Sequence, residues 1–256
     1  MAPDHDRKQK QKASISAPLP APAEQSPDAE EYGPIFFHKE WEEFGFMSNF
    51  YPTAFTAPHP ASWLFGQHGL DSTPASSSTG DEAQTSITFH HSEQYYMYCK
   101  ALYFGDDDAA RKIVNTVSPT ACKDVGRSVK GFSEKTWRKH ELDVRVMKEA
   151  LWWKFGGGQL KSLLEKPQGG LTGPELNTTE NRMNSLNYLG RRLLATGERQ
   201  LLEAAGSDKY WGIGFSIQQG PHQYEKSWGR NLLGKALMGV RERLRRLING
   251  EEDEQE

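Results

Sequence analysis

Polar side chains set among aromatic residues are the features of this sequence best suited to chemistry, and Glu93 is the first of them. An alternating polar and apolar stretch, residues 85–90, predicts a half-buried strand. Helical spacing follows over residues 92–104 and places Glu93 in the first turn, with His91 or Ser92 near the cap. A carboxylate there is a candidate for acid–base chemistry. It is equally a residue that the helix dipole favours and keeps ionised, so the spacing alone leaves both roles open.

Two other positions could bind an anion. Lys123 and Arg127 stand four residues apart on a short predicted helix, so both cations would point to one side and could hold a phosphate. Residues 229–231, Gly-Arg-Asn, precede the last predicted helix, where free backbone N–H groups would reinforce the charge of Arg230. The alternatives are a solvated face for the first pair and a capped helix with an exposed arginine for the second.

Trp137 and Asp208 add an aromatic ring and a second carboxylate. Trp137 lies in the first turn of a long predicted helix and could stack on a flat base, although packing in the core is the commoner role. Asp208 could cap a turn that leads into residues 210–217, which is a structural role. Further polar residues with aromatic surroundings are Asn49, Lys100 and Glu203.

The common cofactor and metal motifs do not occur. The sequence has no Gly-x-Gly-x-x-Gly, no Walker-type loop, no His-Glu-x-x-His and no Gly-x-Ser-x-Gly. The glycine triplet at residues 156–158 is expected to end a helix rather than to open one, which argues against a phosphate cradle there. Cys99 and Cys122 have no metal-ligand spacing and are expected to be packed thiols in a reducing compartment.

Composition and charge indicate an intracellular protein. Of the 256 residues, 36% are apolar and 25% are charged, as in a soluble globular protein with a polar tail. The net charge of −3 argues against sequence-blind nucleic-acid binding through bulk charge, but it is compatible with a local basic pocket. We find neither a secretory signal nor an apolar run that could span a membrane. A cytoplasmic location is expected, and the basic patch near the N-terminus leaves a nuclear one open.

A single domain is expected to position the candidate residues. Residues 1–33 are interpreted as a disordered arm, residues 34–248 as the domain, and residues 249–256 as an acidic tail. Flexible insertions are expected at about 66–84 and 166–190. The predicted fold class is α+β: helix-rich and compact, with a few short strands.

The predicted helices have recognisable ends. Ser118 and Pro119 begin a short helix, and Ser133 caps a long one that runs from residue 134 to about residue 155. The last helix begins near Asn231, whereas residues 209–217 alternate enough to be a strand or an extended edge. Two apolar stripes should face the core: Trp137, Val144, Met147, Leu151 and Phe155 in the long helix, and Leu233, Leu237, Val240, Leu244 and Leu247 in the last.

These residues fall into an ordered series of motifs. The series includes Ser48-Asn49-Phe50-Tyr51-Pro52, Ser92-Glu93-Gln94, Lys100-Ala101, Ala121-Cys122-Lys123-x-x-Gly126-Arg127, Trp137, Asp208-x-x-Trp211-Gly212-x-Gly214 and Gly229-Arg230-Asn231-x-Leu233-Gly234. In this order the chain resembles the NADAR family, the YbiA-like N-glycosidases, over nearly all of residues 35–247. It departs from the family at Met47, where a leucine is usual, and in its long insertions and extra arm, which bear on substrate access and specificity.

The resemblance implies hydrolysis of an N-glycosidic bond between ribose C1′ and a nitrogen of a base-like group. Characterised relatives act on phosphorylated ribosylamino-pyrimidine intermediates of riboflavin biosynthesis, or remove ADP-ribose from modified guanine in nucleic acid. The family's catalytic residues fall on Glu93, Trp137 and Asp208. Glu93 would stabilise an oxocarbenium-like centre and activate water. Trp137 would stack on the base, and Asp208 would position water or ribose hydroxyls, or protonate the leaving group.

The implied partner is a small phosphorylated ribosyl substrate or an ADP-ribosylated nucleic acid, without cofactor, metal or membrane. Its candidate contacts are Asn49, Lys100, Lys123, Arg127, Trp211, Arg230 and Asn231. The oligomeric state stays open. An alternative is a non-catalytic module that binds ADP-ribose or NAD. Two carboxylates beside an anionic ligand would weaken such binding, so their presence favours catalysis.

Overall fold

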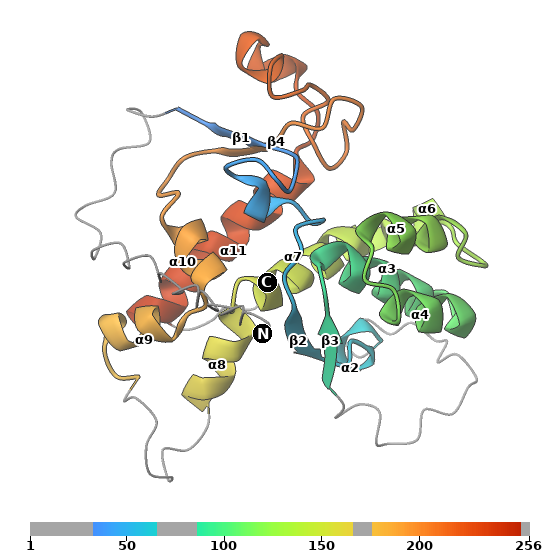
Figure 1. Cartoon of the computed structure of the whole chain (residues 1–256), viewed down its shortest axis with the longest axis horizontal. Coiled ribbons are helices and arrows are strands. Elements are labelled where there is room, and N and C mark those ends of the chain that lie inside the picture. Colours follow the sequence, from blue (N-terminus) through green and yellow to red (C-terminus); the bar gives the residue numbers. More distant parts are fainter. Residues whose placement is uncertain (1–32, 66–85, 166–175, 252–256) are drawn as a thin grey trace, which may run out of the picture.

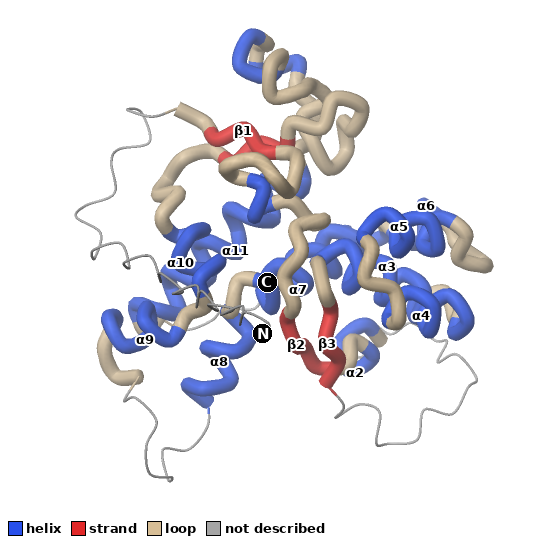
Figure 2. Tube along the Cα trace, in the orientation of Figure 1, coloured by secondary structure: helices blue, strands red, loops and turns tan. Residues whose placement is uncertain are grey.

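Helices dominate the part of the chain that the structure describes, and the strands in that part form two short pairs (Figure 2). The computed structural model describes residues 33–65, 86–165 and 176–251. The expected arm up to residue 32, the insertion at 66–84, the start of the second insertion and the end of the acidic tail lie outside these ranges. The described part is α+β and helix-rich, as predicted. Every helix in those ranges is too short or too polar to cross a membrane.

The two strand pairs occupy different parts of the molecule (Figure 1). β1 (Ile35–Phe37) pairs in parallel with β4 (Leu201–Glu203), although most of the described chain separates them. β2 (Phe55–Pro58) pairs with β3 (Ser86–Phe89) in an antiparallel arrangement. The strand predicted at residues 85–90 is therefore confirmed as β3.

The central helix is α3 (Ser92–Tyr103), and its residues from Ser92 to Ala101 are all buried. Nδ1 of His91 caps it by accepting the backbone N–H of Gln94 at 3.0 Å. The Gln94 side chain accepts the N–H of His90 and donates to the carbonyl of Ile113. The amide thereby ties the start of α3 to the end of α4 (Asp107–Val114). This start is where Glu93 lies.

Helix α5 (Pro119–Arg127) approaches α3 closely at Gly126. A Cβ atom at that position would overlap the sulfur of Met97, so only glycine fits without displacing this side chain. Ser118 caps α5 and Pro119 begins it, as predicted. The cysteines on these two helices, Cys99 and Cys122, are buried free thiols, which confirms the expected packing.

The long helix predicted from Ser133 onward is interrupted, which corrects that prediction. It consists of α6 (Glu134–Trp137), a 3-10 turn (Lys139–Glu141) and α7 (Leu142–Lys154). His140 and Glu141 have left-handed φ angles of 53° and 55°. The polar residues at the break are exposed. Helices in proteins are stabilised mainly by the packing of an apolar face, and these exposed polar residues offer none.

The glycine triplet also differs from expectation, because it both ends α7 and opens α8 (Gly157–Glu165). Gly156 has a φ of 85°, which stops α7. A Cβ at Gly157 would overlap the ring of Trp152, so the tight turn into α8 also requires glycine.

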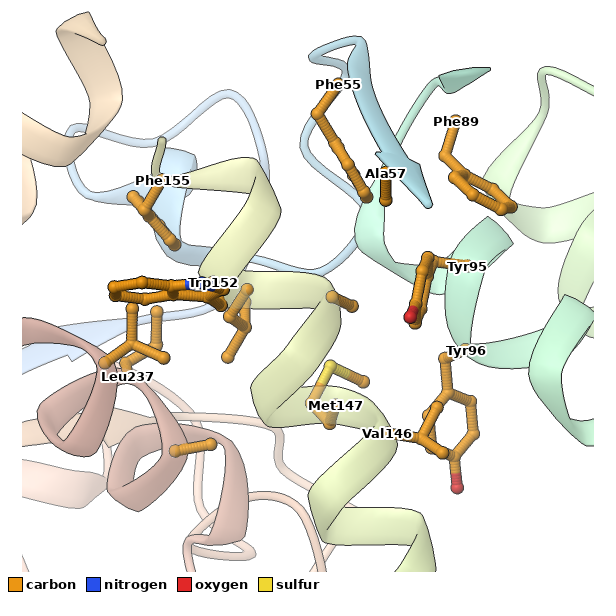
Figure 3. Packing of buried hydrophobic residues seen from close by; sticks show 14 of the residues in the cluster. Phe55, Ala57, Phe89, Tyr95, Tyr96, Val146, Met147, Trp152, Phe155 and Leu237 are labelled. Carbon is orange, nitrogen blue, oxygen red and sulfur yellow. The ribbon is translucent and has the colours of Figure 1, made fainter. Parts of the chain in front are cut away.

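Helix α11 (Leu232–Asn249) begins where the sequence predicts, after Asn231. Both predicted apolar stripes are buried, so their core assignment is confirmed. In Figure 3, α7 directs Val146 and Met147 toward Tyr96 of α3, and Trp152 toward Leu237 of α11. Helix α7 therefore packs between the two helices whose N-terminal ends carry candidate residues.

Two further predictions are wrong. The second insertion was expected to be flexible to residue 190, but α9 (Thr179–Ser185) and α10 (Tyr188–Leu194) occupy its latter part. Thr178 and Asn187 cap these helices, and the buried Leu186 lies between them. Residues 209–217 form turns rather than a strand. The remaining described elements are α2 (Ala61–Leu64) and 3-10 turns at Gly45–Met47, Gly220–His222 and Glu225–Ser227.

Candidate functional site

A pocket of about 180 Å³ lies where α3, α5, α7, β4 and α11 converge. It is smaller than the roughly 300–1,000 Å³ of pockets that enclose drug-sized ligands. It can therefore enclose a group of about the size of one sugar ring, but not a whole drug-sized ligand. Its lining residues are Asn49, Glu93, Tyr96, Met97, Lys123, Met147, Glu203, Asp208, Trp211 and Leu233.

Glu93 is held in this pocket by a reciprocal pair of hydrogen bonds with Asn49. The amide Nδ2 of Asn49 donates to Glu93 Oε2 at 2.5 Å, and the backbone N–H of Glu93 donates to the Asn49 carbonyl at 3.0 Å. Glu93 is only 3% exposed. Burial raises the pKa of its carboxyl to about 7, although the charges of Lys123, Lys100 and Arg127 oppose this rise. Desolvation outweighs the ionising effect expected at the helix start, and the carboxyl is poised to exchange protons near neutral pH.

A buried lysine supports the loop that carries Asn49. Nζ of Lys154, at the end of α7, donates to the carbonyl of Ser48 at 2.7 Å. Lys154 is 1% exposed, and burial lowers the pKa of its amine to about 7. The contact joins residues 106 positions apart and fixes the backbone next to Asn49. Lys154 is therefore a positioning residue for the partner of Glu93.

Lys154→Met is expected to remove a pH dependence of stability. The pKa of Lys154 is lower in the folded protein than the ordinary 10.5, so the wild type gains stability as pH rises from about 7 toward 10.5. Relative to the variant, we expect the wild type to gain about 2–3 kcal/mol between pH 6 and pH 9. Urea unfolding of both proteins at the two pH values measures this difference. Lys235→Met, at an exposed position of α11, should leave it unchanged. Parallel pH profiles for the wild type and Lys154→Met would contradict the assignment.

Two further carboxyl groups, from Asp208 and Glu203, line the pocket. Oδ1 of Asp208 accepts the backbone N–H groups of Tyr210 and Trp211, both at 2.8 Å. This is the turn-capping role that the sequence allows. Burial raises the pKa of Glu203 to about 8, and the negative charges of Asp208 and Glu93 add to this effect. Lys123 opposes it and is the one cationic residue among the described lining residues.

Aromatic rings form one wall of the pocket. Tyr96 and Trp211 line it, with their ring centroids 5.6 Å apart in an edge-to-face arrangement. Trp137 lies behind Tyr96 and donates from Nε1 to the Tyr96 hydroxyl at 2.8 Å. Trp137 is 3% exposed and does not line the cavity. The structure thus presents Tyr96 and Trp211 to a ligand and places Trp137 as the support of Tyr96.

A family model for the NADAR domain matches residues 35–245. The chain belongs to the NADAR family. The match spans the described elements from β1 to most of α11, and so includes every segment that lines the pocket.

A metal site is not found in the part of the chain that the structure describes. Among those residues, no group of three or more His, Cys, Asp or Glu side chains is placed to hold an ion.

Several curated relatives are similar to this NADAR chain. "N-glycosidase R617" of Acanthamoeba polyphaga mimivirus is 36% identical over 151 residues, covering 59% of this chain and 71% of the relative. "Protein irg-1" of Caenorhabditis elegans is 29% identical over 77% of this chain and 74% of its own length. "Riboflavin biosynthesis protein VVA0006" of Vibrio vulnificus is 24% identical over 82% of this chain and 38% of its own length. The solved structure of the E. coli protein YbiA matches with a TM-score of 0.47 and 22% identity, over 83% of this chain and 85% of that one.

The structure brings half of the site residues expected from the NADAR resemblance into the pocket. Those that line it are Asn49, Glu93, Lys123, Asp208 and Trp211. Those that do not are Lys100, Arg127, Trp137, Arg230 and Asn231. The first group comes from four separate segments, so the pocket depends on the complete packing of α3, α5 and the 203–211 segment.

Two of the expected phosphate contacts are engaged elsewhere. Lys100 is buried, donates to the carbonyl of Gly126 at 2.9 Å and lies 3.5 Å from the ring centre of Phe132. Arg127 is exposed and pairs with Asp124 at 3.2 Å. Of the expected pair on α5, only Lys123 reaches the pocket.

The Gly-Arg-Asn segment lacks the free N–H groups that an anion site would need, which corrects that expectation. The backbone N–H groups of residues 229–233 donate to carbonyls of residues 209–213. Arg230 is exposed, with its guanidinium 4.9 Å from the ring centre of Tyr210. The buried side chain of Asn231 accepts the N–H of Glu203 at 3.0 Å and donates to the carbonyl of Leu201 at 2.8 Å. The motif therefore fastens β4 and the adjacent turn to the start of α11.

Glu203 is a charged pocket residue to which sequence analysis assigned no role. It was noted only as a polar residue in aromatic surroundings, yet its carboxyl group lines the cavity. A signal does exist, because Glu203 is the one charged residue in the apolar run of residues 201–205. An isolated carboxylate in a buried strand is seldom retained without a partner or a task. Lys154 and Tyr96 were missed as well, and their contacts depend on the complete fold.

Proposed function

We propose that this NADAR chain is an N-glycosidase that hydrolyses the bond between ribose C1′ and the nitrogen of a base-like leaving group. The observation that carries the proposal is Glu93, a buried carboxyl at the pocket with a pKa of about 7 and a fixed hydrogen bond to Asn49. Such a group can take a proton from water at neutral pH. The name of the mimivirus relative, an N-glycosidase, agrees with this chemistry.

The proposed reaction uses water as the nucleophile. As the C1′–N bond lengthens, positive charge develops on the ribose, and carboxylates in a small buried pocket stabilise it. Ionised Glu93 takes a proton from water, whose oxygen bonds to C1′, while the electron pair of the broken bond passes to the leaving nitrogen. Tyr96 and Trp211 provide apolar ring surface against which a planar leaving group can pack.

The substrate is proposed to be phosphorylated, and Lys123 to contact its phosphate. Lys123 lines the pocket with its Nζ 5.4 Å from the ring centre of Phe50. It shares the pocket with Glu93, Glu203 and Asp208, and its charge acts on the carboxyl groups of Glu93 and Glu203. Without a cation these groups would repel a phosphate ester, so Lys123 is the residue that permits an anionic substrate to approach.

Lys123→Met is expected to raise KM for a phosphorylated substrate by about 10- to 100-fold, the cost of losing a hydrogen bond to a charged group. Arg127→Met is the matched control, because it removes a cation from the same helix that pairs with Asp124 and does not line the pocket. Steady-state kinetics of both variants make the comparison. Equal effects would show that bulk charge, rather than a phosphate contact at Lys123, governs binding.

Two substrate classes follow from the family resemblance, and one experiment separates them. Purified protein is incubated with a phosphoribosylamino-pyrimidine and with an oligonucleotide that carries ADP-ribosylated guanine. Release of ribose phosphate or of ADP-ribose is then followed. We expect turnover of at least one, lowered by about 10²- to 10⁴-fold in Glu93→Gln. Tight binding of ADP-ribose with no turnover of either substrate would instead establish a binding module.

A further inference from the structure

The three carboxyl groups of the pocket differ in their hydrogen bonds. Glu93 is bonded to Asn49, and Asp208 accepts two backbone N–H groups. Oε2 of Glu203 is buried and has no hydrogen-bond partner among the described residues. A buried carboxyl oxygen without a partner is costly, and a substrate that supplies the partner removes this cost. Glu203 is thus the carboxyl group that is free to act on a bound molecule.

The backbone of Glu203 is fixed from both sides. Its N–H donates to the side chain of Asn231, and its carbonyl accepts the N–H of Ile213 at 2.8 Å. A Cβ at Gly212 would lie 2.7 Å from that same carbonyl, so the turn carrying Asp208 packs directly against β4. Strand pairing with Phe37 completes the support. With its backbone held in this way, the side chain keeps its position in the pocket.

The surroundings of Glu203 favour its neutral form. Burial is the main cause, and the neighbouring carboxylates of Asp208 and Glu93 add to it, so that the pKa is about 8. Lys123 on α5 acts in the opposite direction. A protonated carboxyl is a hydrogen-bond donor, and an acid with a pKa near the working pH is suited to protonate a leaving group.

We propose that Glu203 is the general acid of the reaction, donating its proton to the leaving nitrogen as the C1′–N bond breaks. This role rests on the proposed N-glycosidase function. The nitrogen gains the proton of Glu203, C1′ gains the water oxygen, and Glu93 gains a proton from that water. The products are the free base-like group and the ribose hydroxyl. Glu93 then releases its proton to solvent, and Glu203 takes up a proton from solvent, which restores the starting state. Asp208 remains a turn residue that keeps Glu203 protonated through its charge.

The leaving group of the substrate tests this role. A ribosylamino-pyrimidine needs protonation of its nitrogen, whereas a para-nitrophenyl riboside with the same phosphate leaves as a stable anion. For Glu203→Gln we expect kcat on the nitrogen substrate to fall by about 100-fold or more, and kcat on the nitrophenyl substrate by less than about 5-fold. Glu180→Gln, at an exposed position of α9, should alter neither. Equal losses on both substrates would overturn the assignment.

The wild type provides a second measurement that does not depend on the folding of a variant. Its kcat on the nitrogen substrate should decline at alkaline pH as Glu203 ionises, and this decline should be absent for the nitrophenyl substrate. An equal decline of kcat at alkaline pH on both substrates would also exclude Glu203 as the general acid. If the wild type turned over neither the ribosylamino-pyrimidine nor ADP-ribosylated guanine, the proposed function itself would be refuted, and this pattern is distinct from a failure of Glu203 alone.

Discussion

Glu93→Gln is expected to lower kcat by about 10²- to 10⁴-fold, the usual contribution of a positioned acid–base group. The amide has nearly the same shape as the carboxyl and can still accept the hydrogen bond from Asn49. It has no basic oxygen with which to take a proton from water. Single-turnover measurements on the preferred substrate give the rate of the chemical step. Glu43→Gln, at an exposed position, serves as the control. Undiminished turnover by Glu93→Gln would exclude Glu93 as the base.

The same substitution should stabilise the protein at alkaline pH. The pKa of Glu93 rises from 4.5 to about 7 on folding, so the native state binds this proton more tightly than the unfolded state does. The resulting stability is fully present below pH 4.5 and is lost as the pH rises through about 7. Glutamine has no such loss. At pH 8 we therefore expect Glu93→Gln to be more stable than the wild type by up to about 3 kcal/mol, as measured by urea unfolding. A variant of equal stability at pH 8 would show that Glu93 is solvated.

Asn231→Ala is expected to destabilise the fold by about 2–4 kcal/mol. The substitution leaves the N–H of Glu203 and the carbonyl of Leu201 without their partners inside the protein, and each such group costs about 1–3 kcal/mol. Alanine also tolerates the left-handed φ of 51° less well than asparagine does. Thermal and urea unfolding measure the loss.

The control for Asn231 is its neighbour. Arg230→Ala changes an exposed side chain that makes a ring contact with Tyr210, and its effect should be within about 0.5 kcal/mol. Asn231→Asp keeps the oxygen that accepts from Glu203 and loses the N–H that donates to Leu201, so its effect should lie between the two. If Asn231→Ala and Arg230→Ala were equally stable, the segment would have no fastening role.

The elements that can be predicted from the sequence are those whose own residues mark their ends or their buried side. Ser118 followed by proline marks the start of α5, and the apolar stripe of α11 identifies its buried side. The break between α6 and α7 has no sequence signal, because Arg138 to Glu141 contains neither glycine nor proline; in the structure these four polar residues are exposed. The parallel pairing of β1 with β4 joins distant segments of three residues each, for which no local pattern exists.

The residues of the candidate site also divide into those with a local sequence signal and those whose contacts depend on the complete fold. Glu93 was identifiable because it follows a strand and starts a helix, and both are visible in the sequence. A lysine is a common phosphate ligand, but the ammonium of Lys100 donates to the carbonyl of Gly126 instead. This carbonyl comes within reach of Lys100 only when α5 packs on α3. Nor could the sequence show that Lys154 reaches Ser48. The protonation of Glu93 and Glu203 depends on burial, which is a property of the assembled pocket.

The contact between Gly126 and Met97 has a consequence for the range of molecules that the protein can accept. Met97 lines the cavity, and its thioether chain is flexible enough to move when pressed. A methyl group added at position 126 would overlap its sulfur and force it to move. The absence of a side chain at Gly126 therefore leaves Met97 the space that it occupies beside the cavity. A larger residue at position 126 would therefore change the shape of the cavity while all groups that carry out the reaction stay the same.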